Sequence, residues 1–169
     1  MLVRVKLEEA PLLRELEIET YRETFSSYIQ EEDLNHYFSN ELSLEQIKKD
    51  FEELMSETYF VLKDEKAVGF LKFNWGEAQT EKELEDAFEI HRIYLLKAYQ
   101  GEGLGKEMFD FALKQAVERD FTWAWLGVWE RNFKAQAFYS QYGFEKFSEH
   151  EYVTGNTVDT DWLLKKYLK

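Results

Sequence analysis

The chain lacks cysteine altogether and has a single proline, Pro11, among its 169 residues. Without cysteine it can form no disulfide, no thiolate metal site and no cysteine nucleophile, which is compatible with a reducing compartment. Long apolar runs are also missing. The longest runs from Trp123 to Trp129, far short of the ~20 residues that a membrane-spanning helix needs. Arg4 and Lys6 interrupt the N-terminus before a signal-peptide core can form. We therefore expect a cytoplasmic protein that does not cross a membrane.

Basic residues are also few compared with acidic ones. The sequence has 21 basic and 34 acidic residues, a formal net charge of −13. This balance disfavours non-specific attraction to nucleic acid or to anionic lipid, so neither is an expected partner. His36 and His150 have no partners at ligand spacing, and we assign no metal site. No Ser/Gly-rich linker or internal repeat divides the chain, and residues 1–169 are expected to form one domain.

The spacing of apolar residues predicts an α/β fold in which helices pack on a mixed sheet. The expected order is β-α-α-α-β-β-β-α-β-α-β-β. Strands are expected over Leu2–Lys6, Tyr59–Leu62, Ala67–Phe73, Phe88–Leu96, Trp123–Val128, Phe144–His150 and Thr157–Lys165. Helices are expected after Pro11, over Glu31–Asn40, after Ser43, and over Gly103–Arg119 and Asn132–Tyr142. Ser43 begins a capping box, and Ile47, Phe51 and Leu54 should share one helix face. The acid-rich segment Gly76–Asp86 is expected to be a solvated loop.

The strongest local motif is a glycine-rich turn placed where a strand gives way to a helix. It consists of Gln100, Gly101, Glu102, Gly103, Leu104 and Gly105. Glycines leave the backbone N–H groups unshielded, and the helix that follows adds the positive end of its dipole, so the turn can hold a pyrophosphate. Lys106 stands where a Rossmann loop needs its third glycine, and the segment also lacks the Gly-Lys-Ser/Thr of a P-loop. The alternative interpretation is that the turn caps the helix and binds no ligand.

A second motif follows the apolar strand that ends at Trp129. Its residues are Asn132, Ala135, Phe138, Tyr139, Gly143 and Phe144. Together the two motifs resemble the GNAT superfamily of acetyl-CoA-dependent N-acetyltransferases, from the Tyr59 strand onward. More narrowly, segments 89–95 and 125–132 resemble the bacterial spermine/spermidine N-acetyltransferases. The resemblance implies a mostly antiparallel central sheet flanked by helices, acetyl-CoA as cofactor, and direct transfer of acetyl to a primary amine in a ternary complex.

The resemblance also implies which residues bind acetyl-CoA. The glycine turn from Gln100 to Gly105 would hold the pyrophosphate, and the backbone of Ile93, Tyr94 and Leu95 would pair with the pantetheine arm as an added strand. Asn132, Ala135, Phe138 and Tyr139 would complete the cofactor site. Tyr139 would be the general acid for the departing thiolate.

An amine acceptor arrives as an ammonium ion with a pKa of ~10, so a base must first remove a proton. Glu89 is the expected base, and the resemblance implies that it acts directly or through water. His91 is the alternative base or a substrate-binding residue, and it can equally be a structural histidine of the strand. Strand alternation places both on one face unless the strand contains a bulge.

The acceptor is expected to be a small amine, and the acidic composition favours a polyamine such as spermidine or spermine. Glu31 and Glu32, and the segment from Glu81 to Asp86, would line its entrance. The same acids can instead serve solubility alone. Two alternatives remain: an acetyltransferase for protein N-termini, lysines or other small amines, and a catalytically weak sensor module that binds acyl-CoA. Exposed aromatic residues such as Trp75 and Tyr152 leave room for a homodimer.

Overall fold

The computed structural model describes residues 1–153 and 155–169. Its seven strands form one sheet in the order β1-β2-β3-β4-β5-β7-β6. The strands are β1 (Leu2–Arg4), β2 (Ser56–Lys63), β3 (Lys66–Trp75), β4 (Ala87–Leu95), β5 (Trp123–Trp129), β6 (Glu145–Thr154) and β7 (Thr157–Tyr167). The helices are α1 (Ala10–Phe25), α2 (Glu31–Asn40), α3 (Leu44–Asp50), α4 (Leu104–Glu118) and α5 (Phe133–Gln141). The predicted order of elements is confirmed.

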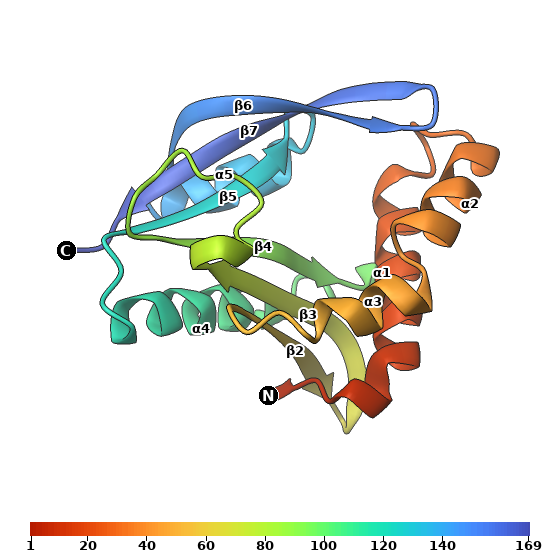
Figure 1. Cartoon of the computed structure of the whole chain (residues 1–169), viewed down its shortest axis with the longest axis horizontal. Helices are drawn as coiled ribbons and strands as arrows, with labels where there is room; N and C mark the ends of the chain where they lie inside the picture. The colour runs from red at the N-terminus through yellow and green to blue at the C-terminus, as the bar shows by residue number, and fades with distance from the viewer.

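The sheet is antiparallel except at its centre, where β4 pairs with β5 in parallel. This parallel pairing covers only residues 87–89 of β4 and 123–125 of β5. Beyond Glu89 and Trp125 the two strands diverge, and Figure 1 shows the gap widening toward α1 and α2. The sheet is therefore divided into two halves, β1 to β4 and β5 to β7, joined at one end.

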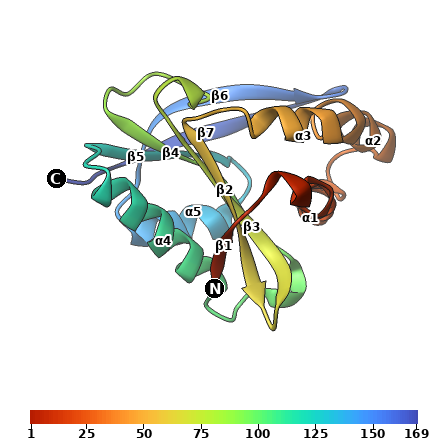
Figure 2. The same cartoon turned by 60° about the horizontal axis from the view of Figure 1, so that its bottom comes forward.

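The two faces of the sheet are covered by different helices (Figure 2). Helices α4 and α5 cover one face through a large apolar cluster that includes Phe88, Ile90, Met108, Phe109 and Leu126. Helices α1 and α3 cover the other face of β1 to β3, with Leu13, Leu16, Ile47 and Phe70 buried between them. Residues alternate across a strand, so Phe88 and Ile90 in β4 face α4 while Glu89 faces away. That opposite face carries the polar side chains described below.

Helix α3 differs in two details from the sequence prediction. Ser43 caps α3 by accepting from Gln46 N at 3.1 Å, but the Gln46 side chain bonds to Asp50 instead of reaching back as a capping box requires. The helix ends at Asp50, so Leu54 lies beyond it and is 90% exposed. The prediction that Leu54 shares the buried face of this helix is wrong.

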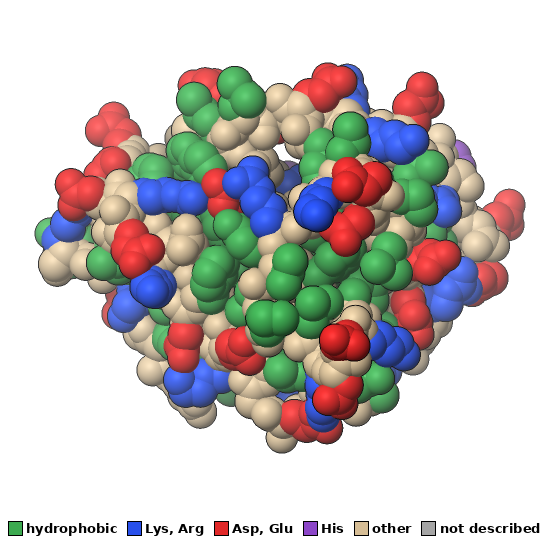
Figure 3. Space-filling view, turned by 90° about the horizontal axis from the view of Figure 1, so that it is seen from below, with side chains coloured by type: hydrophobic (Ala, Val, Ile, Leu, Met, Phe, Trp, Pro, Cys, Tyr) green, Lys and Arg blue, Asp and Glu red, His purple; other side chains and the backbone are tan. Residues whose placement is uncertain are grey.

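The two aromatic residues expected on the surface are both half-buried. Trp75 lies under the Arg119 guanidinium, whose Cζ is 4.4 Å from the ring centroid. Tyr152 lines the central cavity described below. Neither therefore supports the expected homodimer, which stays a prediction. Seen from below, apolar side chains occupy the middle of the molecule and charged ones surround them (Figure 3). No helix of the described residues is long and apolar enough to cross a membrane.

Candidate active site

A cavity of about 490 Å³ lies where β4 and β5 diverge. Leu96 N donates to Val68 O on β3 at 3.0 Å. Because hydrogen-bonding direction alternates along a strand, Ile93 and Leu95 direct their N–H and C=O groups away from β3, toward the cavity. The Gln100 side chain already donates to Leu95 O at 3.1 Å. Ile93, Tyr94 and Leu95 thus line the cavity as a half-open strand edge, which suits an extended amide-containing ligand.

The glycine turn lies between β4 and α4, next to one mouth of this cavity. Gly101 and Gly103 have φ of 84° and 85°, a left-handed conformation that favours glycine. A Cβ placed on Gly101, Gly103 or Gly105 would meet no atom within 4 Å. No carbonyl among the described residues accepts from the amides of Leu104, Gly105 and Lys106. Open space over unpaired N–H groups at a helix N-terminus fits the pyrophosphate of acetyl-CoA.

The polar side chains of this turn point elsewhere. Glu102 forms an ion pair with Lys63 on β2, and Gln100 Oε1 lies 3.5 Å from Lys134 Nζ on α5. Gln100 also lines the cavity, whereas Glu102 does not. Glu102 therefore belongs to the candidate cofactor site through its backbone alone.

Helix α5 forms the opposite wall. Asn132 caps it, its Oδ1 accepting from Ala135 N at 3.2 Å, so its amide nitrogen is left for the cavity. Asn132, Ala135 and Tyr139 all line the cavity. Burial raises the pKa of Tyr139, so its hydroxyl keeps its proton at neutral pH. Phe138, predicted in the cofactor site, instead packs in the apolar cluster, with its ring centroid 5.4 Å from that of Phe109.

A bulge in β4 arranges the other polar residues. The register with β3 pairs Lys72 with Arg92 and Phe73 with Ile90, which leaves His91 as the extra residue. Asn74 Nδ2 lies 3.0 Å from Glu89 Oε1 and 3.1 Å from His91 Nδ1. Glu89 and His91 therefore lie on one side of the sheet, as predicted, although the strand is not regular between them. The bulge also brings Arg92 to the face that His91 occupies, and all three line the cavity.

Glu89 is 2% exposed and is held by three donors. Oε1 accepts from Asn74 Nδ2 and from Thr80 N, the latter at 2.9 Å, and Oε2 accepts from the Thr80 hydroxyl. Burial raises the pKa of Glu89, and the hydrogen bonds from Thr80 and Asn74 oppose that rise. The segment Gly76–Asp86 is thus more than a solvated loop, because its Thr80 fixes the carboxylate. One lone pair on Oε2 remains for a further donor.

The tautomer of His91 follows from its contact with Asn74. The amide nitrogen Nδ2 of Asn74 can only donate a hydrogen bond, so His91 accepts at Nδ1 and keeps its own proton on Nε2. Burial lowers the pKa of His91 well below its ordinary value, and Arg92 and Lys72 lower it further. A neutral ring with a proton on Nε2 presents a donor to the cavity. This favours Glu89 over His91 as the base.

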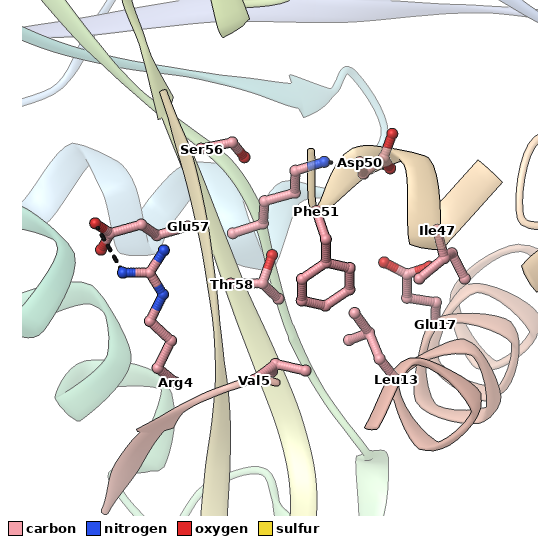
Figure 4. Close-up of a pocket in the computed structure, with 11 residues that line it drawn as sticks. Arg4, Val5, Leu13, Glu17, Ile47, Asp50, Phe51, Ser56, Glu57 and Thr58 are labelled. Carbon is pink, nitrogen blue, oxygen red and sulfur yellow. Dashed lines mark hydrogen bonds and ion pairs between the residues drawn. The ribbon is translucent and has the colours of Figure 1, made fainter. Parts of the chain in front are cut away.

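A buried ion pair supports the bulge from the α1 side. Arg92 Nη1 donates to Glu17 Oε1 at 2.9 Å, and Glu17 is 5% exposed. Glu17 also lines a small cavity of about 80 Å³, where Figure 4 shows it projecting among Leu13, Ile47 and Phe51. Its Oε2 is buried without a partner. The pair fixes Arg92 at the bulge, and the free oxygen has room for a water molecule.

The other mouth of the main cavity carries residues that the sequence interpretation had not assigned to the site. They are Tyr21, Tyr37, Trp129, His150, Tyr152 and Asp161. His150 Nδ1 lies 2.9 Å from Glu81 Oε1, which also lines the cavity. Glu31 and Glu32, predicted at the acceptor entrance, do not line it: Glu31 pairs with Arg22, and Glu32 is exposed on α2. Within the described residues no three His, Asp or Glu side chains form a group that could hold a metal ion.

Comparison with known proteins gives a consistent family. Residues 11–144 match the acetyltransferase (GNAT) family model. An uncharacterised N-acetyltransferase from the pepI 3′ region of Lactobacillus delbrueckii subsp. lactis is 35% identical over 167 residues, covering 99% of this chain and 96% of that protein.

Solved structures share the fold. The PaiA N-acetyltransferase from Thermoplasma acidophilum, in complex with coenzyme A, superposes with a TM-score of 0.77 at 19% identity, covering 99% of this chain and 98% of that one. The ribosomal-protein-S18-alanine N-acetyltransferase from Escherichia coli gives a TM-score of 0.71 at 14% identity, over 100% and 94% of the two chains. With the family match and the relative from Lactobacillus, this shows that the chain belongs to the GNAT family of N-acetyltransferases, which use acetyl-CoA as acetyl donor.

Proposed function

We propose that the protein transfers acetyl from acetyl-CoA to a primary amine of a small polycationic acceptor, a polyamine such as spermidine or spermine. The observation that carries this proposal is the distribution of charge around Glu89. We call the part of the cavity away from the glycine turn its acceptor side. It carries Glu81, Glu89 and Asp161, and Arg92, the one arginine among the described lining residues, is already paired with Glu17. A cation entering this side loses hydration but meets carboxylates.

A second hollow, of about 580 Å³, adjoins the same residues from the α3 side. It reaches His91 and Arg92 and is lined by five carboxylates, those of Glu41, Asp50, Glu52, Glu53 and Glu77. Against these stand Lys49, Lys72 and Arg92, and Lys72 Nζ lies 3.5 Å from Asp50. The approach to the base is therefore acidic from two directions, which supports an acceptor with more than one positive charge.

The residues can be given roles in this reaction. Glu89 takes the proton of the reacting ammonium at Oε2, directly or through water, since its other lone pairs are occupied. His91 donates from Nε2 toward the cavity, so it can bind an oxygen such as the thioester carbonyl and cannot bind an ammonium group, which only donates. When bound, acetyl-CoA supplies the acetyl group as an activated thioester, held by the glycine turn and the edge of β4. Tyr139 holds a proton at Oη for the leaving group, since a phenol is protonated at neutral pH and burial raises the pKa of Tyr139 further.

The experiment is a survey of acceptors in which release of free CoA is followed with a thiol reagent. The chain has no cysteine, so the protein itself contributes no thiol background. Acetyl-CoA is offered with spermidine, spermine, aminoglycosides and peptides with free N-termini. We expect turnover with the polyamines, and a KM for spermidine that rises more steeply with salt than the KM for a monoamine. Preference for peptides at matched concentration would instead favour a protein N-terminal amine as acceptor. Binding of acetyl-CoA without turnover of any amine would favour a sensor module.

A further inference from the structure

Asp161 is a carboxylate inside the cavity that no protein donor satisfies. It lies on β7, is half-buried and lines the acceptor side of the cavity. No hydrogen bond joins its carboxylate to any other described residue, and its register partner on β6, His150, is engaged with Glu81. Buried carboxylates are normally paired or hydrogen-bonded. Asp161 is therefore placed to receive a cation from outside the chain.

The strand beside it is shaped to leave this carboxylate accessible. Trp125, Gly127 and Trp129 are every second residue of β5 and therefore lie on the same face of the strand. Gly127 is exposed between the two tryptophans. A Cβ on Gly127 would lie 3.6 Å from Asp161 Oδ2. Glycine in the interior of a central strand weakens the strand and often marks the close approach of a ligand. Here it opens a notch with Asp161 at its edge.

The notch and the candidate base lie at a separation that suits one small molecule. Glu89 pairs with Trp125, and the Asp161 carboxylate leans over Gly127, two residues further along β5. Two residues span roughly 7 Å along a strand and neighbouring strands lie about 4.8 Å apart, so the two positions are separated by roughly 8 Å. A short alkyl chain between two amino groups covers such a distance. Aromatic residues, including Trp129 and Tyr152, line the space around it, and ring faces also attract ammonium groups.

We propose that Asp161 is a specificity-determining residue: it binds the second, non-reacting ammonium group of an alkyl diamine or polyamine whose first amine is acetylated beside Glu89. This rests on the proposed function and adds to it the residue that reads the second charge. Asp161 takes no part in proton transfer. Its removal should affect acceptors with two amines and spare acceptors with one.

The test compares cadaverine with pentylamine, which differ by one terminal amino group. In the parent protein we expect kcat/KM to be at least about tenfold higher for cadaverine, and Asp161→Asn to remove most of that preference by raising the KM for cadaverine. Its kcat/KM for pentylamine should stay within about twofold of the parent value. Glu151→Gln is the matched control, because it removes a carboxylate from exposed Glu151 on β6, which does not line the cavity. It should keep the preference.

Asp161→Ala serves as a second variant should the Asn variant fold poorly, and calorimetry with acetyl-CoA checks that the cofactor site is intact. Equal losses with both amines, or an unchanged ratio, would overturn the role of Asp161 while leaving amine acetylation in place. A parent protein that shows no preference for cadaverine would overturn it as well. If the parent binds acetyl-CoA and acetylates neither amine, the proposed function fails together with the inference.

Discussion

Replacing Gly105 with glutamate should separate cofactor binding from folding. Gly105 is the second residue of α4, its φ is not in the left-handed region, and a Cβ there would meet no atom within 4 Å. Gly103 is less suitable for this test, since its φ of 85° strains any residue with a side chain. At Gly105 the protein loses nothing in packing. A glutamate side chain at Gly105 would, however, fill the space and cover the N–H groups that a bound pyrophosphate needs.

Opposite changes are expected in stability and affinity. A glycine inside a helix is less favourable than other residues by about 0.5–1 kcal/mol, and an acidic residue in the first turn is favoured by the helix dipole, so Gly105→Glu should stabilise the fold by a similar amount. A unit charge ~4 Å from each phosphate charge is repelled by roughly 1–4 kcal/mol, depending on the effective dielectric constant. The Kd for CoA should therefore rise by roughly 5- to 1,000-fold.

Titration calorimetry with CoA and acetyl-CoA, run beside thermal unfolding, measures both quantities. Gly105→Gln is the control for bulk, because it has nearly the same shape as glutamate without the charge, and Gly105→Ala isolates the effect of helix propensity. We expect Kd to increase in the order Ala, Gln, Glu, while all three variants unfold at or above the parent temperature. A Gly105→Glu protein that is folded and binds CoA like the parent would refute the assignment of the pyrophosphate site.

Three further predictions address the chemistry. Tyr139→Phe should lower kcat by roughly 10- to 1,000-fold with little change in the Kd for CoA, and an unchanged kcat would remove Tyr139 from the reaction. Glu89→Gln should move the rise of kcat/KM to higher pH, where more of the amine is already neutral; an unaltered profile would point to His91 or a water chain. Burial raises the pKa of Asp161 from 3.8 to about 6, so its unfolded-state carboxyl ionises first and stability falls as pH rises between these values. At pH 7 the Asp161→Asn protein should then have a free energy of unfolding about 1 kcal/mol higher than the parent, once solvent access is allowed for, and so unfold at a higher temperature. In calorimetric scans this difference should vanish below pH 4.

The order of elements was predictable because each long element carries its own periodic signal. Pro11 in the first turn of α1, the two polar residues Asp64 and Glu65 between β2 and β3, and Gly143 after α5 are local signals of this kind. Asp64 and Glu65 indeed take φ of 49° and 63°, the left-handed values that a tight hairpin needs. Leu54 was misassigned because periodicity alone cannot tell where a short helix stops.

The site was predictable only where its residues lie close together in the sequence. The glycine turn and the Asn132 to Tyr139 face are contiguous motifs, whereas Asp161 reaches the cavity through the pairing of β7 with β5. No local pattern reveals that pairing. Glu31 and Glu32 show the converse error: they were chosen for charge in a helix near the substrate side, but only the tertiary packing of α2 decides which face meets the cavity. The bulge at His91 likewise depends on register with β3 and has no signature in β4 alone.

Three departures from ordinary folding preference occur in the cavity or in the glycine turn beside it, and packing explains none of them. Gly127 interrupts the interior of a central strand, where a larger residue would strengthen the sheet. Glu89 is a carboxylate buried at 2% exposure in a strand. Gly105 lies in the first turn of a helix with open space around it. Each of these choices lowers stability, and a sequence selected for folding alone has no reason to make all three at one place. They are consistent with a ligand that approaches the backbone at Gly105 and at Gly127 and exchanges a proton near Glu89, as the proposed acetyl transfer to a diamine requires.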